Sequence, residues 1–311
     1  MPSSRPVDES TWRHAQASIT APSSSAIVAN ASPYTFRLHY VDAAPSTNSA
    51  PAKRTILLIH GFPQTSLQWR RVIPHLTSAG CRVIVPDYRG AGNSQAPPSN
   101  AGTAGGVGGG YTKRVMADDL HTLLHSVLKI QGKVHIVGHD IGAMIAHAEF
   151  YYKVVTEQPQ NVWHFTFHNV QDDLPERLVT GHERTYIRHF FDRLMVNPWA
   201  IAPGGEEEDA YVLASSRPGA MRAAFDAYRA FEVDGQENLA LLKERGKGQV
   251  PVSTLAEDGS FNRQQNREQI AEFHKYVEAD IVSNSGHYIP DENPDELAEK
   301  IVAWASKIDG E

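Results

Sequence analysis

The sequence of 311 residues has little of what marks the more specialised classes of protein. It contains one cysteine, Cys81, which cannot form an internal disulfide and which we expect to fill space in the core. No apolar run approaches the roughly 20 residues of a membrane-spanning helix, and residues 1–22 are polar, without the apolar stretch of a signal peptide. Basic blocks are also absent, since 29 Lys and Arg stand against 36 Asp and Glu, giving a formal net charge of −7. These absences predict a soluble cytoplasmic protein without a membrane or nucleic-acid partner, acting on a small uncharged molecule.

The sequence does contain a regular alternation of strand and helix patterns towards both of its ends. Apolar runs bounded by turn residues predict strands at residues 34–41, 54–60, 82–87, 133–137, 250–256 and 280–283. Helical patterns cover residues 67–79, 115–128, 143–155, 263–277 and 294–307, and a glycine-rich segment, 96–110, predicts a loop. This order predicts a mostly parallel sheet with helices on both faces, formed by residues 1–158 and 249–311. Residues 159–248 would be inserted as a helical cap.

The segment Gly138-His139-Asp140-Ile141-Gly142 lies between a predicted strand and a predicted helix, and this is the pattern of a nucleophile elbow. In such an elbow, small flanking residues let the backbones approach closely and the central side chain projects above the sheet. Here the central residue is Asp140. The competing interpretation is an ordinary turn stabilised by an aspartate.

An aspartate at the elbow favours a particular chemistry. Its ordinary pKa is about 3.9, so it is an anion at neutral pH and needs no base to become a nucleophile. It can attack an sp3 carbon that carries a leaving group. Strained epoxides and alkyl halides are the substrates that fit, and the product of the attack is an ester on the enzyme.

Two further segments suggest the rest of a hydrolytic site. His60-Gly61-Phe62-Pro63 ends a predicted strand, and in such a fold the backbone amides of Phe62 and Ile141 would converge as an oxyanion hole. His287 lies after the last predicted strand, and it is distinguished from the other histidines by the chain order of nucleophile, acid and base.

Four segments together resemble the epoxide hydrolase and haloacetate dehalogenase branch of the α/β-hydrolase superfamily, from about Tyr34 onward. They are His60-Gly61-Phe62-Pro63-Gln64, Asp87-Tyr88-Arg89-Gly90-Ala91-Gly92-Asn93-Ser94, Gly138-His139-Asp140-Ile141-Gly142 and Gly286-His287. The resemblance implies the α/β-hydrolase fold and an aspartate nucleophile. Haloacetate dehalogenases would carry an arginine pair just after the nucleophile, where this sequence has Ile141, Ala143 and Met144.

The middle of the sequence resembles the cap of one epoxide hydrolase subgroup. The similar segments are residues 162–167, 181–184 and 225–229. In that subgroup a histidine and a tyrosine of the cap bind the epoxide oxygen, and the resemblance assigns these roles to His164 and Tyr228. Two donors aimed at a developing alkoxide would act as acid catalysts. The alternative is a Trp- and Phe-rich helix face that packs on the core.

The sequence departs from this family where a further strand should follow the nucleophile helix. Only residues 156–161 lie there, so the strand that would supply the acid for His287 is missing, unless residues 163–170 form it and offer Asp172 or Asp173. We favour the cap interpretation of that segment. The acid is then Asp258, with Glu257 as its rival.

Together these observations predict an epoxide hydrolase that needs no cofactor or metal. Asp140 would attack the epoxide, His164 and Tyr228 would stabilise the leaving oxygen, and His287 with Asp258 would activate water. A dehalogenase with the same nucleophile, or a non-hydrolytic protein that has lost the acid, are the alternatives. The sequence leaves the assembly open, a homodimer included.

Overall fold

The computed structural model describes residues 7–21, 34–46, 52–99, 109–147, 162–258 and 266–311. Seven strands are found in these ranges. They are β1 (Trp12–Ala21), β2 (Tyr34–Ala43), β3 (Arg54–Ile59), β4 (Cys81–Pro86), β5 (Val134–Gly138), β6 (Val252–Glu257) and β7 (Val277–Val282). No helix in the described ranges is long and apolar enough to cross a membrane.

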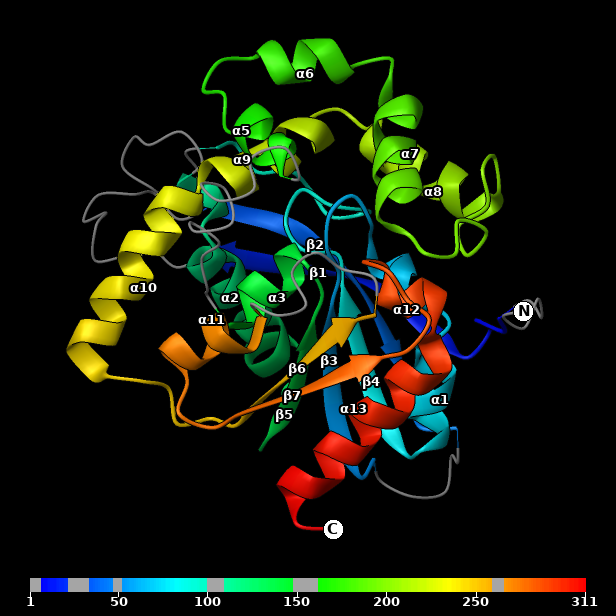
Figure 1. Cartoon of the computed structure of the whole chain (residues 1–311), viewed down its shortest axis with the longest axis vertical. Helices are drawn as coiled ribbons and strands as arrows, with labels where there is room; N and C mark the ends of the chain where they lie inside the picture. The colour runs from blue at the N-terminus through cyan, green and yellow to red at the C-terminus, as the bar shows by residue number, and fades with distance from the viewer. Residues whose placement is uncertain (1–6, 22–33, 47–51, 100–108, 148–161, 259–265) are drawn as a thin grey trace.

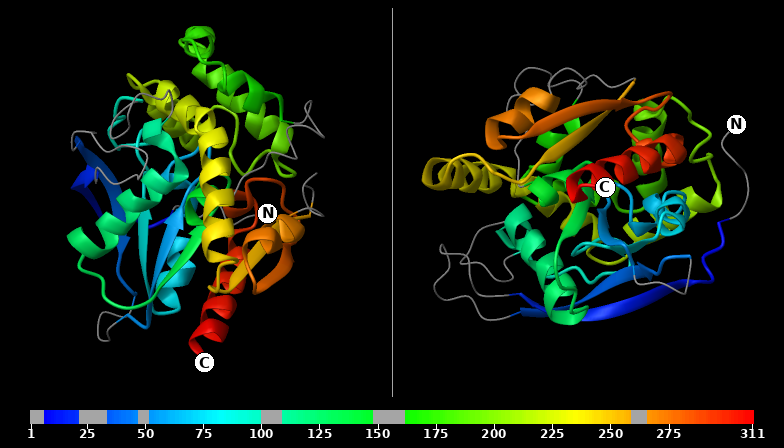
Figure 2. Two further views of the ribbon diagram at one scale, coloured as in Figure 1. Left: turned by 90° about the vertical axis from the view of Figure 1, so that its left-hand side faces the viewer. Right: turned by 90° about the horizontal axis from the view of Figure 1, so that it is seen from below.

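The helices of the sheet region and those of the middle of the chain form two groups. The first contains η1 (Ser66–Trp69), α1 (Ile73–Ser78), η2 (Gly109–Tyr111), α2 (Lys113–His121), η3 (Thr122–Val127), α3 (Ile141–His147), α11 (Asn266–Phe273), α12 (Ile289–Glu292) and α13 (Pro294–Asp309). The second contains α5 (Trp163–His168), α6 (Leu174–Val179), α7 (Glu183–Leu194), α8 (Glu206–Ser215), α9 (Ala220–Arg229) and α10 (Phe231–Arg245). Figures 1 and 2 show α5 to α9 grouped beyond one end of the sheet, while α10 runs back alongside it.

The strands form two sheets within the described ranges. One has the order β1-β2-β4-β3-β5, in which β3 is parallel to both β4 and β5 while β1 and β2 are antiparallel additions. The other is the parallel pair β6-β7. In this arrangement β5 pairs with β3 and lies at the edge of its sheet, and Ile136 is 48% exposed.

The alternation of side chains along β3 explains why helices cover both faces of the larger sheet. Ile56 and Leu58 pack in the core beneath α1 and α13, whereas Leu57 and Ile59 pack in the other core with residues of α2 and α3. Because successive side chains of a strand point to opposite faces, an unbroken apolar strand needs cover on both sides. The predicted fold class, an α/β-hydrolase fold with helices on both faces of a mostly parallel sheet, is confirmed.

Strand β1 was not predicted, because its buried side chains are small. Ala15, Ala17 and Ile19 alternate with polar residues, and Ala17 and Ile19 lie opposite Leu38 and Phe36 of β2. Alanine contributes little to an apolar pattern, so the period of two is weak in the sequence. It is the long antiparallel pairing with β2 that establishes β1 as a strand.

The predicted helix at residues 67–79 is interrupted. The structure has the 3₁₀ helix η1 and then α1, whose first turn contains Pro74. Proline lacks a backbone N–H and is tolerated at the start of a helix rather than inside it, so α1 begins there. The predicted helix at 115–128 is present as α2, which begins at Lys113 and continues into η3.

Helix α5 decides one of the alternatives that the sequence left open for the missing strand. Residues 163–168 form α5, so the alternative in which 163–170 are a strand is wrong, and with it the assignment of Asp172 or Asp173 as the acid. A helix is formed because the Trp and Phe side chains pack on neighbouring helices. Residues 148–155 of the predicted nucleophile helix, 263–265 of the predicted helix at 263–277, and 100–108 of the predicted loop lie outside the described residues.

Candidate active site

Asp140 lies between the last residue of β5, Gly138, and the first residue of α3, Ile141. Its φ of 52° is in the left-handed region that non-glycine residues rarely adopt. The turn is close-packed: a Cβ on Gly138 would lie 2.3 Å from the carbonyl oxygen of Gly142, and one on Gly142 would lie 2.2 Å from that of Ile59. Glycine at both positions therefore lets α3 approach β3, and the backbone forms the expected elbow.

The two carboxylate oxygens of Asp140 have different partners. Oδ1 accepts a hydrogen bond from the backbone N–H of Phe62 at 2.8 Å. Oδ2 lies 3.8 Å from Nε2 of His287. Both side chains are partly accessible, Asp140 to 16% and His287 to 28%. Oδ2 is therefore the oxygen free to act as a nucleophile.

Phe62 and Ile141 occupy the positions expected of an oxyanion hole in different ways. The Phe62 amide already donates to Oδ1 of Asp140. It would keep this hydrogen bond if Oδ1 became the carbonyl oxygen of an ester. Ile141 is the first residue of α3, where backbone N–H groups have no partner inside the helix. An amide N–H in this position can donate a hydrogen bond to an oxygen that develops negative charge.

His287 is held by its backbone as well as by its ring. Its N–H donates to the carbonyl oxygen of Leu194 at 2.8 Å, and its own carbonyl accepts from Nε2 of His139 at 2.7 Å. Burial lowers the pKa of His287, while the charge of Asp140 opposes that shift. A neutral imidazole beside the carboxylate of Asp140 can serve as a general base.

Among the described residues, Asp140 is the carboxylate that pairs with His287. Asp258 directly follows β6 and is exposed, and the structure shows no ion pair between it and His287. Glu257 is buried, and its charge raises the pKa of His139, although burial dominates and lowers that pKa to about 4. The assignment of Asp258 as the acid, with Glu257 as its rival, therefore stays a prediction.

His164 and Tyr228 come from α5 and α9, and the fold brings them together. Their ring centroids are 5.9 Å apart, and the Tyr228 ring is 5.8 Å from that of Phe62. Burial raises the pKa of Tyr228 and lowers that of His164 to about 3, and in both cases Asp140 is the next largest influence. Both groups are therefore neutral near pH 7, and each can donate a hydrogen bond.

The residue after Tyr228, Arg229, is buried and was not predicted as part of the site. Arg229 binds Glu176 and Asp226, and it also donates to the carbonyl oxygens of Val170 and Asp172. These contacts join α9 to α6 and to the turn after α5. The sequence signal for Arg229 was the similar segment 225–229, in which only Tyr228 was assigned a role.

Two buried ion-pair groups fasten the helices of the middle region to the sheet region. Lys113 at the start of α2 pairs with Asp234 of α10 at 2.9 Å and also donates to the carbonyl oxygen of Ala227. Arg70, after η1, pairs with Asp291 of α12 at 2.7 Å and with Glu207 of α8 at 2.9 Å. Breaking a buried pair is costly. These contacts therefore hold α10 against α2, and they hold α8 against the segment that follows η1.

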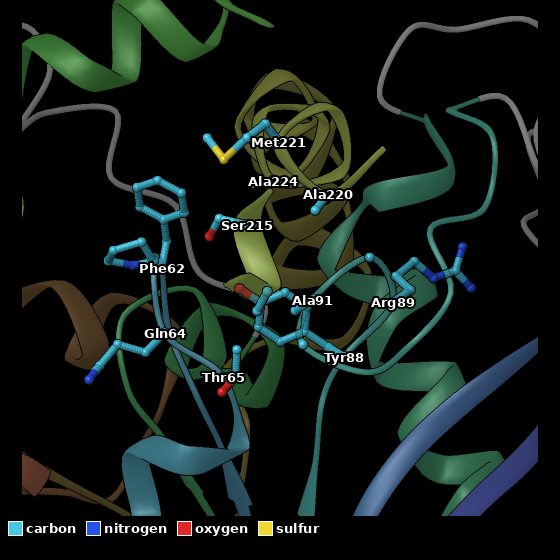
Figure 3. A pocket seen from close by; sticks show the side chains of 14 residues that line it. Phe62, Gln64, Thr65, Tyr88, Arg89, Ala91, Ser215, Ala220, Met221 and Ala224 are labelled. Carbon is cyan, nitrogen blue, oxygen red and sulfur yellow. The ribbon is translucent and has the colours of Figure 1, made fainter. Parts of the chain in front are cut away.

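A hollow lies next to Phe62, with an empty volume of about 410 Å³ that includes the open solvent at its mouth. Phe62 and Tyr88 flank it, and Met221 of α9 lies above them (Figure 3). Arg89 turns away from it and pairs with Asp119. The wall is formed by residues 62–65 and 88–92, Ala214, Ser215, Ala220, Met221 and Ala224.

Three buried histidines should make the fold sensitive to acid. Burial lowers the pKa of His60, His164 and His168, whereas unfolded histidines titrate near 6.5. Below about pH 6.5 these histidines are therefore protonated in the unfolded chain but not in the folded chain. The free energy of unfolding falls as the pH drops. For His164, with its pKa of about 3, the loss at pH 5 is about 2 kcal/mol.

We therefore expect the urea midpoint to fall steeply between about pH 7.5 and pH 5. A His168→Gln variant should lose less stability over the same interval, because one of the three groups no longer titrates. An unchanged pH dependence in that variant would contradict the assignment.

The comparisons with known proteins agree with the geometry. Residues 54–195 match the family model described as the α/β hydrolase fold. A soluble epoxide hydrolase of Corynebacterium sp. (strain C12) is 30% identical over 284 residues, which cover 83% of this chain and 90% of that protein. The structure of the epoxide hydrolase CorEH without ligand superimposes with a TM-score of 0.75 at 26% identity, covering 96% of this chain and 99% of that one. Cfl2 from Burkholderia cenocepacia gives a TM-score of 0.70 at 27% identity, covering 86% and 92%. With a relative this similar over most of both sequences, the chain belongs to the epoxide hydrolase family of the α/β-hydrolase fold.

Proposed function

We propose that this protein opens an epoxide to a vicinal diol through a covalent ester on Asp140. The observation that carries the proposal is the elbow carboxylate itself, with one oxygen on the Phe62 amide and the other facing His287. The family relationship supports the reaction class, since the Corynebacterium relative is named a soluble epoxide hydrolase. An uncharged epoxide fits a site with buried neutral donors.

In the first step, Oδ2 of Asp140 attacks a ring carbon and the C–O bond on that carbon breaks. The oxygen that leaves develops negative charge and takes a proton from Tyr228, while the neutral imidazole of His164 donates a hydrogen bond to it. Both groups are neutral and buried, so their hydrogen bonds are strong and need little reorganisation. The result is a hydroxyalkyl ester of Asp140.

In the second step, His287 takes a proton from water, and the hydroxide attacks the ester carbonyl. The negative oxygen of the tetrahedral intermediate is stabilised by the amides of Phe62 and Ile141. As the intermediate collapses, the imidazolium of His287 gives its proton to the leaving alkoxide, and the proton of the resulting carboxyl group returns to Tyr228, so that the diol is released and the carboxylate of Asp140 is restored. No cofactor or metal takes part in this scheme.

We also propose that residues 159–248 act as a cap on a core formed by residues 1–158 and 249–311. Support comes from the grouping of α5 to α9 beyond the end of the sheet (Figure 1) and from the ion pairs that fasten α8 and α10 to the sheet region. The cap would supply His164 and Tyr228, and the core would supply Asp140 and His287.

Isotope labelling under single-turnover conditions tests the covalent mechanism. With enzyme in excess over an aryl epoxide in H₂¹⁸O, the first diol should carry ¹⁶O, because its new oxygen comes from Asp140. Later turnovers should deliver ¹⁸O. An ¹⁸O-labelled diol in the first turnover would indicate direct attack by water. Failure to convert epoxides, with halide release from alkyl halides, would favour a dehalogenase; failure of both would favour a non-hydrolytic protein.

The two cap donors should each contribute to ring opening. Loss of one such hydrogen bond costs about 3 kcal/mol, or roughly a hundredfold in rate. We therefore expect Tyr228→Phe and His164→Ala each to slow ester formation by about that factor without slowing ester hydrolysis. The double variant should be slower than either. Pre-steady-state measurement of ester formation is the test.

Tyr211→Phe is the matched control for Tyr228→Phe. It also removes a buried tyrosine hydroxyl, but one whose partner is Gln64 and not the site. Its rate of ester formation should stay within about threefold of the parent. If both single variants of the cap pair keep the parent rate, His164 and Tyr228 are packing residues.

A further inference from the structure

The carboxylate of Glu292 accepts hydrogen bonds from four backbone amides. Oε1 accepts from Gly286 at 3.0 Å and Tyr288 at 3.2 Å, the residues on either side of His287. Oε2 accepts from Val196 at 2.7 Å and Asn197 at 2.8 Å, just after α7. The side chain is buried. One carboxylate thus joins the His287 loop to the end of α7.

The same two segments are also in direct backbone contact. The His287 N–H donates to the carbonyl oxygen of Leu194 at 2.8 Å. A Cβ on Gly286 would lie 2.4 Å from that oxygen and 2.8 Å from the amide nitrogen of Val196, so only glycine fits there. Loop 286–288 and residues 194–197 therefore form one unit with Glu292 at its centre.

His287 depends on this unit because the sheets do not fix its position relative to Asp140. Asp140 follows β5 at the edge of the five-stranded sheet, whereas the His287 loop follows β7 of the separate pair. Within the described ranges no strand ladder connects β5 to β6 or β7. The paired carboxylate of His287 in those ranges is Asp140 itself. Within the described ranges, the distance between base and nucleophile is therefore set by the hydrogen bond from His139 to the His287 carbonyl oxygen and by the contacts of loop 286–288.

We propose that Glu292 is a positioning residue for His287, which holds loop 286–288 on residues 194–197 so that Nε2 stays beside Asp140. The inference rests on the proposed function, because it assigns the contact to the second half of the reaction. Ring opening should not need it, since Asp140 is held by its own elbow and by Phe62. Ester hydrolysis should need the Glu292 contact, because a water molecule must be placed between Nε2 of His287 and the ester carbonyl.

Glu292→Gln tests the proposal, because the side chain keeps its size but one acceptor oxygen becomes an NH₂ group that faces two N–H donors. The loop must then shift, and a displacement of about 1 Å costs on the order of a hundredfold in rate. We expect ester hydrolysis to fall by about that factor while ester formation stays within about threefold. The variant should accumulate a covalent adduct on the Asp140 peptide, visible by intact mass and peptide mapping.

Glu296→Gln is the matched control. The Glu296 carboxylate also accepts a hydrogen bond from a backbone amide near this loop, that of Ser283, at 3.0 Å. Its described hydrogen bonds do not include residues 286–288. It should accumulate no adduct. An equal fall of both half-reactions in Glu292→Gln, or no fall in either, would overturn the proposal. If Glu292→Gln does not fold, Glu292→Asp, which keeps the charge but is one methylene shorter, is subjected to the same two measurements and the same criteria.

A measurement without substrate separates this proposal from the proposed function. The imidazole resonances of ¹³C-labelled histidine report the environment of His287, and His287→Gln identifies its signal by its disappearance. In Glu292→Gln the His287 signal should move and its titration should change, even if no epoxide is converted. An unchanged His287 signal and titration in a folded Glu292→Gln protein would overturn the positioning role, whatever the reaction.

Discussion

Replacing Asp140 with asparagine should abolish epoxide turnover and leave a folded protein. Without a carboxylate there is no nucleophile, and in a serine protease loss of the nucleophile costs on the order of a millionfold in rate. The side-chain oxygen of asparagine can still accept a hydrogen bond from the Phe62 amide. Asparagine also tolerates the left-handed backbone at this position, where φ is 52°. We therefore expect an unfolding midpoint close to that of the parent.

Asp140→Ala should be equally inactive but less stable, by about 1 kcal/mol, because alanine is strained in the left-handed region and leaves the Phe62 amide without its acceptor. The two variants separate the chemistry of the carboxylate from its structural contacts. Turnover of a fresh Asp140→Asn preparation at more than a trace of the parent rate would contradict the assignment.

A slow return of activity in Asp140→Asn would support the assignment rather than contradict it. The same His287 and oxyanion amides could hydrolyse the asparagine side chain to a carboxylate. Mass spectrometry of the peptide that contains residue 140 distinguishes this conversion from true activity of the amide, because only the former changes the mass of the peptide in step with the gain in rate.

The elbow could be predicted because its determinants are local. A strand, five residues and a helix specify the turn, and the close approach of Gly138 and Gly142 to neighbouring carbonyl groups shows why small residues are needed there. The alternation of buried strands and helices was also predicted, except that the helix expected at 263–277 ends at Phe273 and the strand expected at 280–283 is β7, which begins at Val277. These features require only short segments of sequence to be interpreted correctly.

The features that could not be predicted depend on contacts between distant segments. Strand β1 is established by pairing with β2, and its alanines leave almost no apolar signal. Glu292 lies five residues after His287 and looks like one more acidic residue near a helix start. Its role depends on amides that are about a hundred residues away in the chain, at Val196 and Asn197. Lys113 shows the same limit, because its partner Asp234 belongs to α10.

The missing strand was predicted from the shortness of segment 156–161, which lies outside the described residues. In the described ranges the outer edge of β5 faces no strand, and Ile136 is 48% exposed on it. In the described ranges the backbone of His287 is held on both sides, because its N–H donates to the carbonyl oxygen of Leu194 and its carbonyl oxygen accepts from Nε2 of His139.

His287→Gln should therefore stop the reaction after its first step. Glutamine fills a similar space but cannot take a proton from water, and loss of a general base costs up to about ten thousandfold in rate. Ring opening uses Asp140 with the proposed donors His164 and Tyr228, none of which is altered. Mixing the variant with one equivalent of epoxide should therefore leave nearly all of the protein as the covalent adduct.

The control is His135→Gln, which removes a histidine that faces Asp309 at 3.2 Å and not the site. It should turn over normally and show no adduct after the substrate is consumed. For His287→Gln, the adduct should map to the peptide that contains Asp140, and it should decay slowly enough to follow by intact mass. A variant that turns over at the parent rate would remove His287 from the mechanism. One that binds epoxide but never forms the adduct would instead place His287 in ring opening, since the carboxylate of Asp140 would then require the imidazole 3.8 Å away in order to attack.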